Sequence, residues 1–252
     1  MTCISVCCLT FNSERTIRQT LESVKEIADE IIVLDSYSTD NTINIVKEFT
    51  DKIHYRKYQY HGLQMNHAIE LCSHDWVFCI DSDERLNREM IEHILRLKLN
   101  GLGKAEAFRV YREWFFMGRQ VHAMYPVTSP DRIVRFFNRN NVRFNERPVH
   151  DKPVGFKTAE VLEGRMLHDS VASLHDLYDK MNKYTTRHAQ GFAGEARKIN
   201  LFHLILNPAA SFVKWYFFKK NFLDGFAGLI LGTYASIYTF MKYAKLYILK
   251  KA

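Results

Sequence analysis

The sequence is poor in the residues that crosslink secreted proteins or bind structural zinc. It contains five cysteines, with no CxxC pair and no spacing typical of a disulfide framework. Four of the five lie in apolar segments with the composition of strands, which favours reduced, buried thiols. The N-terminus leads straight into a predicted strand and shows no pattern of a cleavable signal peptide. We therefore expect a cytoplasmic protein.

Two common nucleotide-binding motifs are also missing. The first predicted strand is followed by Thr10, Phe11, Asn12 and Ser13, which match neither G-x-G-x-x-G nor the Walker lysine loop. Dinucleotide-binding enzymes and P-loop enzymes are therefore poor fits. The chain also has no internal repeat and no low-complexity segment, so solenoids and linkers are not expected.

Composition places the chain among folded α/β proteins with an anionic partner. Of its 252 residues, 47% are hydrophobic and 25% are charged, which excludes a disordered chain. This length suffices for one large domain with an appendage. The formal charge of +7 favours a nucleotide sugar, an acidic membrane surface or a nucleic acid as partner.

Strand and helix patterns alternate over the first hundred residues. Strands are expected at residues 3–9, 30–34, 53–58 and 76–81, and each is followed by a helical pattern. This alternation predicts a mostly parallel sheet flanked by helices. Between residues 105 and 154 the pattern changes to aromatic-rich extended segments, which suit antiparallel strands that cover an acceptor site.

The fourth strand ends in paired carboxylates. Five apolar or aromatic residues precede Asp81, Ser82 and Asp83, so a buried strand delivers Asp-x-Asp to the edge of the sheet where α/β proteins bind ligands. Two carboxylates there favour a divalent cation that holds a phosphate. The alternative is an acidic turn that caps the helix expected near Asn87.

A haloacid-dehalogenase-like phosphatase would also use Asp-x-Asp. Such enzymes carry the motif on the first strand, whereas here it lies on the fourth, and Arg85 stands where their threonine would be. The placement disfavours this reading.

Three motifs together resemble one family. Residues 5–12 (SVCCLTFN), 33–42 (VLDSYSTDNT) and 81–84 (DSDE) are similar in order and spacing to the family 2 glycosyltransferases, inverting enzymes with the GT-A fold. Residues 144–151 (FNERPVHD), 167–170 (LHDS), 222–226 (FLDGF) and 243–246 (YAKL) resemble the branch that adds β-linked glucose to the first heptose of the lipopolysaccharide or lipooligosaccharide inner core. The resemblance implies a UDP-sugar donor and a lipid-linked oligosaccharide acceptor.

The resemblance also implies a set of donor-binding residues. Asp35 would accept hydrogen bonds from the uracil N–H or the ribose hydroxyls, although it could equally cap the following helix. Asp81 is expected at the ribose or, through water, at the metal. The expected donor-binding set is Thr10, Asn12, Asp35, Gln64, Asn66, Asp81, Ser82, Arg132 and Arg135. For the arginines, the guanidinium fork suits phosphate oxygens.

Metal and catalytic residues follow from the same motifs. Asp83 is the expected ligand of Mg²⁺ or Mn²⁺, and His168 resembles a distal histidine that completes coordination in some relatives. Inversion needs one general base for the acceptor hydroxyl. Asp151 is the first candidate and Glu146 the second, because the Glu-Asp pair of many relatives is replaced here by His150 and Asp151.

The last fifty residues predict helices that associate with a membrane. Asn207 and Pro208 suggest a helix start, followed by aromatic residues interleaved with lysines. No charged residue occurs from Gly225 to Met241, a stretch at the short limit for a bilayer span. Amphipathic attachment to the cytoplasmic face of the inner membrane is therefore favoured over spanning. The alternative is a helix pair packed on the catalytic domain.

The chain is expected to divide into three parts. These are a nucleotide-sugar-binding half at residues 1–100, an acceptor-binding and catalytic half at 101–200, and the helical tail at 201–252. Nucleic-acid binding is not expected, because the basic aromatic segment is too apolar for a solvated groove. The remaining alternatives are the same transfer onto another glycolipid or capsule acceptor, and a non-catalytic membrane-bound protein that binds nucleotide sugars.

Overall fold

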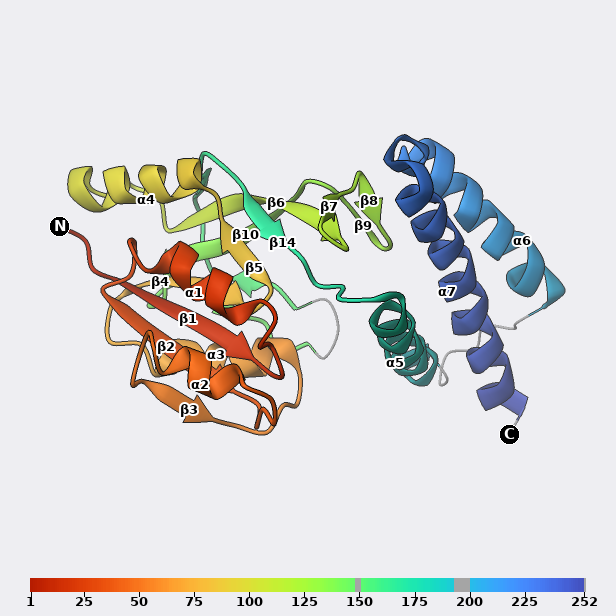
Figure 1. Ribbon diagram of the computed structural model, residues 1–252, viewed down its shortest axis with the longest axis horizontal. Coiled ribbons are helices and arrows are strands. Elements are labelled where there is room, and N and C mark those ends of the chain that lie inside the picture. Colours follow the sequence, from red (N-terminus) through yellow and green to blue (C-terminus); the bar gives the residue numbers. More distant parts are fainter. Residues whose placement is uncertain (148–150, 193–199, 252) are drawn as a thin grey trace. The chain divides into compact units, whose positions relative to one another are not determined.

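The computed structural model describes residues 1–147, 151–192 and 200–251 (Figure 1). The chain forms two compact units, and each is described here by itself. The first unit comprises Met1–Arg112 and Arg132–His168, and the second comprises Glu113–Asp131 and Asp169–Ala252. The three-part division expected from the sequence separates the chain by the expected role of each part, and not by compact units. It stays a prediction.

A mixed β-sheet organises the first unit. Among the described residues it has the strand order β3-β2-β1-β4-β10-β6-β14-β5, with β13 also paired to β6; β7 pairs with the end of β6 that belongs to the second unit. The strands β3, β2, β1 and β4 run parallel, and β10 is antiparallel to β4, as the sequence predicts. The strands are β1 (Ile4–Thr10), β2 (Glu30–Asp35), β3 (Ile53–Tyr55), β4 (Trp76–Asp81), β5 (Glu84–Leu86), β6 (Ala107–Phe116), β7 (Arg119–Gln120), β10 (Asp131–Asn138), β13 (Ala159–Val161) and β14 (Met166–His168).

Register places three strand ends at one edge of the sheet. Thr10 pairs with Asp35, and Leu9 pairs with Asp81. The carboxyl ends of β1, β2 and β4 therefore lie side by side, which brings together polar residues that are up to seventy positions apart in the chain. This edge is where parallel α/β sheets bind ligands.

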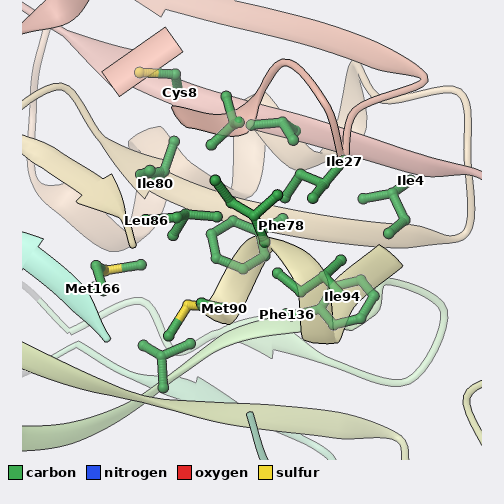
Figure 2. Close-up of a cluster of buried hydrophobic side chains, with 14 of the residues drawn as sticks. Ile4, Cys8, Ile27, Phe78, Ile80, Leu86, Met90, Ile94, Phe136 and Met166 are labelled. Atoms are coloured by element: carbon green, nitrogen blue, oxygen red, sulfur yellow. The ribbon is translucent and has the colours of Figure 1, made fainter. Parts of the chain in front are cut away.

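Helices cover both faces of the parallel strands, and the residues of β1 are therefore buried on both sides. Val6 and Cys8 point into a core with α1, α2 and α4, and Cys7 and Leu9 into a second core with α3. Figure 2 shows part of the first core, where Phe78 and Phe136 pack near Met90 and Ile94. The helices are α1 (Ile17–Val24), α2 (Thr42–Val46), α3 (His61–Glu70) and α4 (Arg88–Asn100).

A short strand follows the Asp-x-Asp motif directly. β5 pairs antiparallel with β14, and Glu84 lies opposite His168. The helix after β5 is capped by Asn87, whose side-chain oxygen accepts a hydrogen bond from the Met90 N–H at 3.0 Å. The acidic residues of the motif therefore do not cap this helix, and that alternative is wrong.

A small hairpin lies beside the sheet edge. β11 (Arg143–Phe144) and β12 (Pro153–Val154) pair antiparallel. Residues 148–150 between them, including His150 of the expected catalytic block, lie outside the described residues.

The second unit is mainly helical. It contains α5 (Leu174–Phe192), α6 (Leu201–Val213), a π-helical turn (Lys214–Phe218), a 3₁₀ turn (Asn221–Asp224), α7 (Gly225–Lys251) and the hairpin of β8 (Ala123–Met124) with β9 (Val127–Thr128). Its core joins aromatic and apolar residues of α5, α7 and the 114–125 segment. Lys245 of α7 donates hydrogen bonds to Asn182 and Thr185 of α5, which joins the two helices.

The predicted start of the tail helix at Asn207 and Pro208 is wrong. α6 begins seven residues earlier, because the Asn200 side chain accepts a hydrogen bond from the His203 N–H in a capping box. Pro208 lies inside this helix, where it removes one backbone hydrogen bond without ending the helix.

None of the helices in the described part of the chain has the length and apolar character needed to cross a membrane. α7 buries a stripe at helical spacing that includes Leu231, Ala235 and Tyr238. Its exposed positions carry apolar residues such as Phe226 and Phe240, while of its lysines only Lys251 is exposed. The amphipathic character expected of the tail therefore stays a prediction.

Candidate active site

Asp81 lies at the centre of a charged network at the sheet edge. Arg135 of β10 donates a hydrogen bond to its Oδ2 at 2.6 Å, and His61 Nε2 lies 3.2 Å from its Oδ1. Burial opposes the charged form of Asp81, but the positive charges of Arg135 and His61 outweigh it and hold the pKa of this carboxyl well below its usual range. Asp81 is therefore a carboxylate at neutral pH.

His61 connects Asp81 to Asp151. As the first residue of α3, it places Nδ1 2.6 Å from Asp151 Oδ2, while its ring packs edge-on against Phe144. Burial alone would lower its pKa, but the Asp81 charge and the hydrogen bonds to both carboxylates raise the pKa of His61 to about 10. At neutral pH the ring is an imidazolium that can donate to both partners.

Glu84 balances the arginines of the network. It is fully buried, and its Oε1 accepts hydrogen bonds from Arg135 at 2.8 Å and from Arg112 at 3.0 Å. Its Oε2 accepts the Asp81 N–H at 3.1 Å. A buried carboxylate with these donors fixes both the backbone of Asp81 and the guanidinium that contacts its side chain.

The two expected metal ligands lie together. His168 Nε2 is 3.2 Å from Asp83 Oδ1, because the pairing of β14 with β5 places His168 beside the motif. Burial disfavours the charged imidazole, but the Asp83 carboxylate outweighs it and raises the pKa of His168.

The spacing of this pair suits a divalent ion. Two atoms about 2.1 Å from one ion and at a right angle to each other would be about 3 Å apart. Within the described ranges, no three His, Cys, Asp or Glu side chains form a ligand cluster. Mg²⁺ in nucleotide enzymes commonly takes only one or two protein carboxylates together with substrate phosphates and water. The residues therefore fit a metal that is shared with a donor diphosphate.

Besides Asp81, four of the expected donor residues lie along the ends of β1, β2 and β4. The Thr10 hydroxyl is buried and has no hydrogen-bond partner among the described residues. Asn12 has a φ of 48°, and its side-chain oxygen accepts the Thr39 N–H at 2.8 Å. The Ser82 hydroxyl lies 2.7 Å from that of Ser13.

Asp35 is fully buried at the end of β2, and both of its oxygens accept hydrogen bonds from Ser38. It therefore holds the loop that follows β2.

The expected residues of α3 contact the protein itself. The Gln64 amide donates to the Arg56 carbonyl at 3.0 Å and to Ser36 Oγ at 3.2 Å, which fixes the chain after β2 and β3. Asn66 exchanges two 2.9 Å hydrogen bonds with the backbone of Phe144. Both side chains are buried, so in this structure they position their neighbours.

Close backbone approach fixes Asp151 next to α3. A Cβ atom on Gly62 would lie 2.7 Å from the Asn145 carbonyl oxygen and 3.1 Å from Asp151 Cβ. Only glycine leaves room for this contact.

A pocket of about 680 Å³ opens beside the network. It is lined by both Asp81 and Asp151 and by four arginines, and its size is typical of ligand sites. Of the two candidate bases, Asp151 faces this pocket, whereas Glu146 is exposed and is not among the lining residues. Arg132 and Arg135, the two arginines expected to bind the donor, also line the pocket. The lining residues are His61, Asp81, Arg109, Arg112, Arg132, Ile133, Val134, Arg135, Phe144, Asp151, Lys152, Pro153, Val154, Gly155 and Phe156.

Sequence reasoning missed three members of the network. Glu84 is the last residue of the Asp-Ser-Asp-Glu motif, but the motif alone indicates no role for it. His61 precedes the apolar pattern that predicts a helix from Leu63, and a histidine at a helix start was its only signal. Nothing in the sequence points to Arg112, because its contact with Glu84 depends on the strand order.

The family of the chain follows from sequence comparison. Residues 5–152, more than half of the chain, match the model of glycosyl transferase family 2. The chain belongs to glycosyl transferase family 2. It is a glycosyltransferase enzyme with the GT-A fold, and the matched residues include β2 and β4, which end at Asp35 and Asp81, and Asp83 in the turn after β4.

Relatives cover nearly the whole chain. An uncharacterized glycosyltransferase of Rickettsia typhi is 28% identical over 96% of this chain and 86% of its own length. The lipopolysaccharide core biosynthesis glycosyltransferase LpsC of Rhizobium meliloti is 27% identical over 97% of this chain and 92% of its own length. The crystal structure of S. aureus TarS matches in fold, with a TM-score of 0.50 and 17% identity over 99% of this chain and 55% of that chain.

Proposed function

We propose that this family 2 glycosyltransferase transfers a hexose, expected to be glucose, from a UDP-sugar to a lipid-linked oligosaccharide with inversion at the sugar carbon. The expected acceptor is a hydroxyl of the inner-core heptose of lipopolysaccharide or lipooligosaccharide. The similarity to LpsC, whose name assigns it to lipopolysaccharide core biosynthesis, supports this acceptor class over other glycolipids and capsule polymers.

One observation carries the proposal. Asp151 and Asp81 line the same pocket and are joined by His61, although Asp151 lies on the hairpin segment and Asp81 at the end of β4. Inverting transfer requires a base and a donor-binding edge that face one space. That Asp151 and Asp81 line one pocket supports these two roles.

Asp151 is the proposed general base. His61 occupies Oδ2, so Oδ1 is the oxygen available to the acceptor hydroxyl. As the acceptor oxygen forms its bond to the sugar carbon, its proton passes to Asp151 Oδ1, and the bond from that carbon to the UDP oxygen breaks on the opposite face.

Asp83 and His168 are proposed to hold Mg²⁺ or Mn²⁺ on the donor side. Such an ion, when bound, neutralises the charge that develops on the departing diphosphate. Thr10, whose buried hydroxyl has no partner in the described chain, is proposed to contact the nucleotide. Asn12, Asp35 and Ser82 shape the same edge.

The helical unit is proposed to attach the enzyme to the cytoplasmic face of the inner membrane, where a lipid-linked acceptor would lie. Exposed aromatic residues and lysines of the π-helical and 3₁₀ turns support this role. Phe218, which is 78% exposed, is followed directly by Lys219 and Lys220, and Phe226 at the start of α7 is 77% exposed.

A screen of nucleotide sugars tests the function. UDP release is measured with and without a heptose-terminated core oligosaccharide and with a divalent ion, and we expect acceptor-dependent release from UDP-glucose. Absence of release from every nucleotide sugar would contradict the proposal.

Two matched variants test the base. Asp151→Asn should lower kcat by about 10²–10⁴-fold, whereas Glu146→Gln should retain most activity. The reverse result would assign the base to Glu146.

A further inference from the structure

The pocket carries more positive charge than its own carboxylates neutralise. Its lining includes five cationic residues besides His61, but only Asp81 and Asp151 as carboxylates. Arg135 and Arg112 are accounted for by Asp81 and by the buried Glu84 behind them. Arg109, Arg132 and Lys152 form no ion pair with a carboxylate within the described residues.

The two arginines are held in place by aromatic rings instead. The Arg109 guanidinium lies 5.6 Å from the centre of the Phe156 ring, and that of Arg132 lies 6.0 Å from the centre of the Tyr111 ring. Arg109 also donates one hydrogen bond, to the Ala159 carbonyl at 3.1 Å. Each guanidinium has five N–H donors, so most of them remain for a ligand.

The location of these cations favours contact with the acceptor over contact with the donor. Lys152 follows Asp151 directly, and Arg109 comes from β6, beyond β10 as counted from the parallel strands that present the donor residues. The family resemblance assigns Arg132 to the donor, but Arg132 lines the same pocket as Arg109 and residues 152–156. Guanidinium and ammonium groups without carboxylate partners bind oxyanions, because the charge-assisted hydrogen bonds offset the loss of hydration.

We propose that Arg109, Arg132 and Lys152 form a subsite for an oxyanion, a phosphate ester or a carboxylate, that the acceptor carries near its attacking hydroxyl. This inference rests on the transferase function proposed above and narrows its acceptor to anionic oligosaccharides. The subsite orients the acceptor so that its hydroxyl meets Asp151.

Ligand-induced stabilisation tests the subsite without requiring catalysis. Thermal unfolding of the full chain is measured with saturating UDP and Mg²⁺, which occupy the donor site, and with increasing inorganic phosphate or acetate. Phosphate or acetate should raise the Tm of the wild type and of the control Lys25→Gln, which removes an exposed charge elsewhere. The rise should be lost in Arg109→Gln/Arg132→Gln. The anion that acts at lower concentration indicates whether a phosphate ester or a carboxylate is preferred.

Kinetics supply the second readout. The double variant should raise KM for an anionic core oligosaccharide about tenfold or more, with KM for the UDP-sugar unchanged. The variant Arg132→Gln/Lys152→Gln, which changes only exposed side chains, replaces it if Arg109→Gln does not fold.

Three results would overturn the subsite. These are an equal Tm rise in the wild type and the variants, no rise in the wild type, and a KM increase for the UDP-sugar alone. Loss of the phosphate effect in the variants, in an enzyme that transfers no sugar, would instead retain the subsite and refute the proposed function.

Discussion

His61 Nδ1 lies 2.6 Å from Asp151 Oδ2, and this contact ties the start of α3 to a residue ninety positions later in the chain. The other ring nitrogen faces Asp81 at 3.2 Å. A single imidazolium therefore holds the orientation of the proposed base and of a carboxylate at the donor edge. The His61 side chain therefore sets the distance between the two carboxylates.

Replacing His61 should lower turnover by removing this bridge. We expect His61→Ala to reduce kcat about 100-fold, because both carboxylates lose a donor and Asp151 can turn away from the pocket. His61→Asn should retain more activity than His61→Gln, since the asparagine amide lies nearer to the position of Nδ1 and so to Asp151. Steady-state kinetics with both substrates measure the effect.

His67→Asn on the same helix is the matched control for the His61 variants, and its kcat should not change. If His61 had a purely structural role, the Asn and Gln variants should lose kcat equally, and both should have a lowered Tm.

The raised pKa of His61 also predicts a pH dependence of stability. Its pKa is about 10 in the folded protein, against an ordinary value of 6.5. Proton binding therefore stabilises the fold fully below pH 6.5, and this contribution is lost as pH rises from 6.5 to about 10. The free energy of unfolding of the wild type minus that of His61→Asn should shrink over this range. A difference that is constant with pH would show that the imidazolium contributes nothing.

The pair of Asp83 and His168 predicts the metal dependence. Asp83→Asn and His168→Gln should each raise the Mn²⁺ concentration needed for half-maximal activity by about 10–100-fold, because each removes one protein ligand. Calorimetric titration of Mn²⁺ in the presence of UDP should show the same loss of affinity. Asp51→Asn, on an exposed loop, serves as control. Unchanged titrations for both variants would remove this pair from the metal site.

The sequence could predict the sheet edge but not the network built on it. Apolar runs that end at Asp35 and Asp81 have strand periodicity, and parallel strands place such ends at one edge, so this part of the site follows from local patterns. The position of His168 beside Asp83 depends on β5, a three-residue strand too short to show periodicity.

Contacts between distant segments explain the other misses. His61 meets Asp151 only because Gly62 lets the two backbones approach, and Asn66 holds Phe144 from the next turn of α3. By contrast, the start of α6 depends on a local signal, the capping bond between Asn200 and His203, which competes in the sequence with the Asn207–Pro208 pair.

Buried Glu30 predicts an acid-sensitive step in stability. Its carboxylate lies at the start of β2 and accepts hydrogen bonds from Lys52 at 2.5 Å, Ser5 at 2.5 Å and the Ser73 N–H at 2.7 Å. Burial would raise its pKa, but these donors lower the pKa of Glu30 from 4.5 to about 2. The stabilisation is present above pH 4.5 and is lost as pH falls towards 2.

Glu30→Gln should therefore cost about 1–3 kcal/mol at pH 7 and less as the pH approaches 2. Urea unfolding between pH 7 and pH 2.5 measures the difference, with the exposed Glu22→Gln as control. An equal cost at both pH values would mean that charge on Glu30 is unimportant.

The exposed turns of the helical unit predict where the enzyme meets a membrane. We define the aromatic ridge as Phe217, Phe218, Phe222, Leu223 and Phe226, all of which are exposed. Its shape is fixed by close packing of the 3₁₀ turn on α7, since a Cβ atom on Gly228 would lie only 1.7 Å from the Asn221 carbonyl oxygen. This packing therefore fixes the backbone that carries the ridge residues. Three lysines lie among them along the chain, at positions 214, 219 and 220.

Phe218→Ser/Phe226→Ser should weaken binding to anionic phospholipid vesicles at least about tenfold, because each phenyl ring loses the free energy of burial in the lipid interface. Lys219→Gln/Lys220→Gln should weaken binding chiefly at low salt, since lysine attraction to headgroups is screened by ions. Leu99→Ser on α4 removes another exposed apolar side chain, 65% exposed, and should leave binding unchanged. Vesicle co-sedimentation measures binding, and UDP release with a soluble heptose-terminated core oligosaccharide checks that the catalytic unit is intact. If the ridge variants sediment like the wild type, this surface does not contact the membrane, and the helical unit serves another purpose.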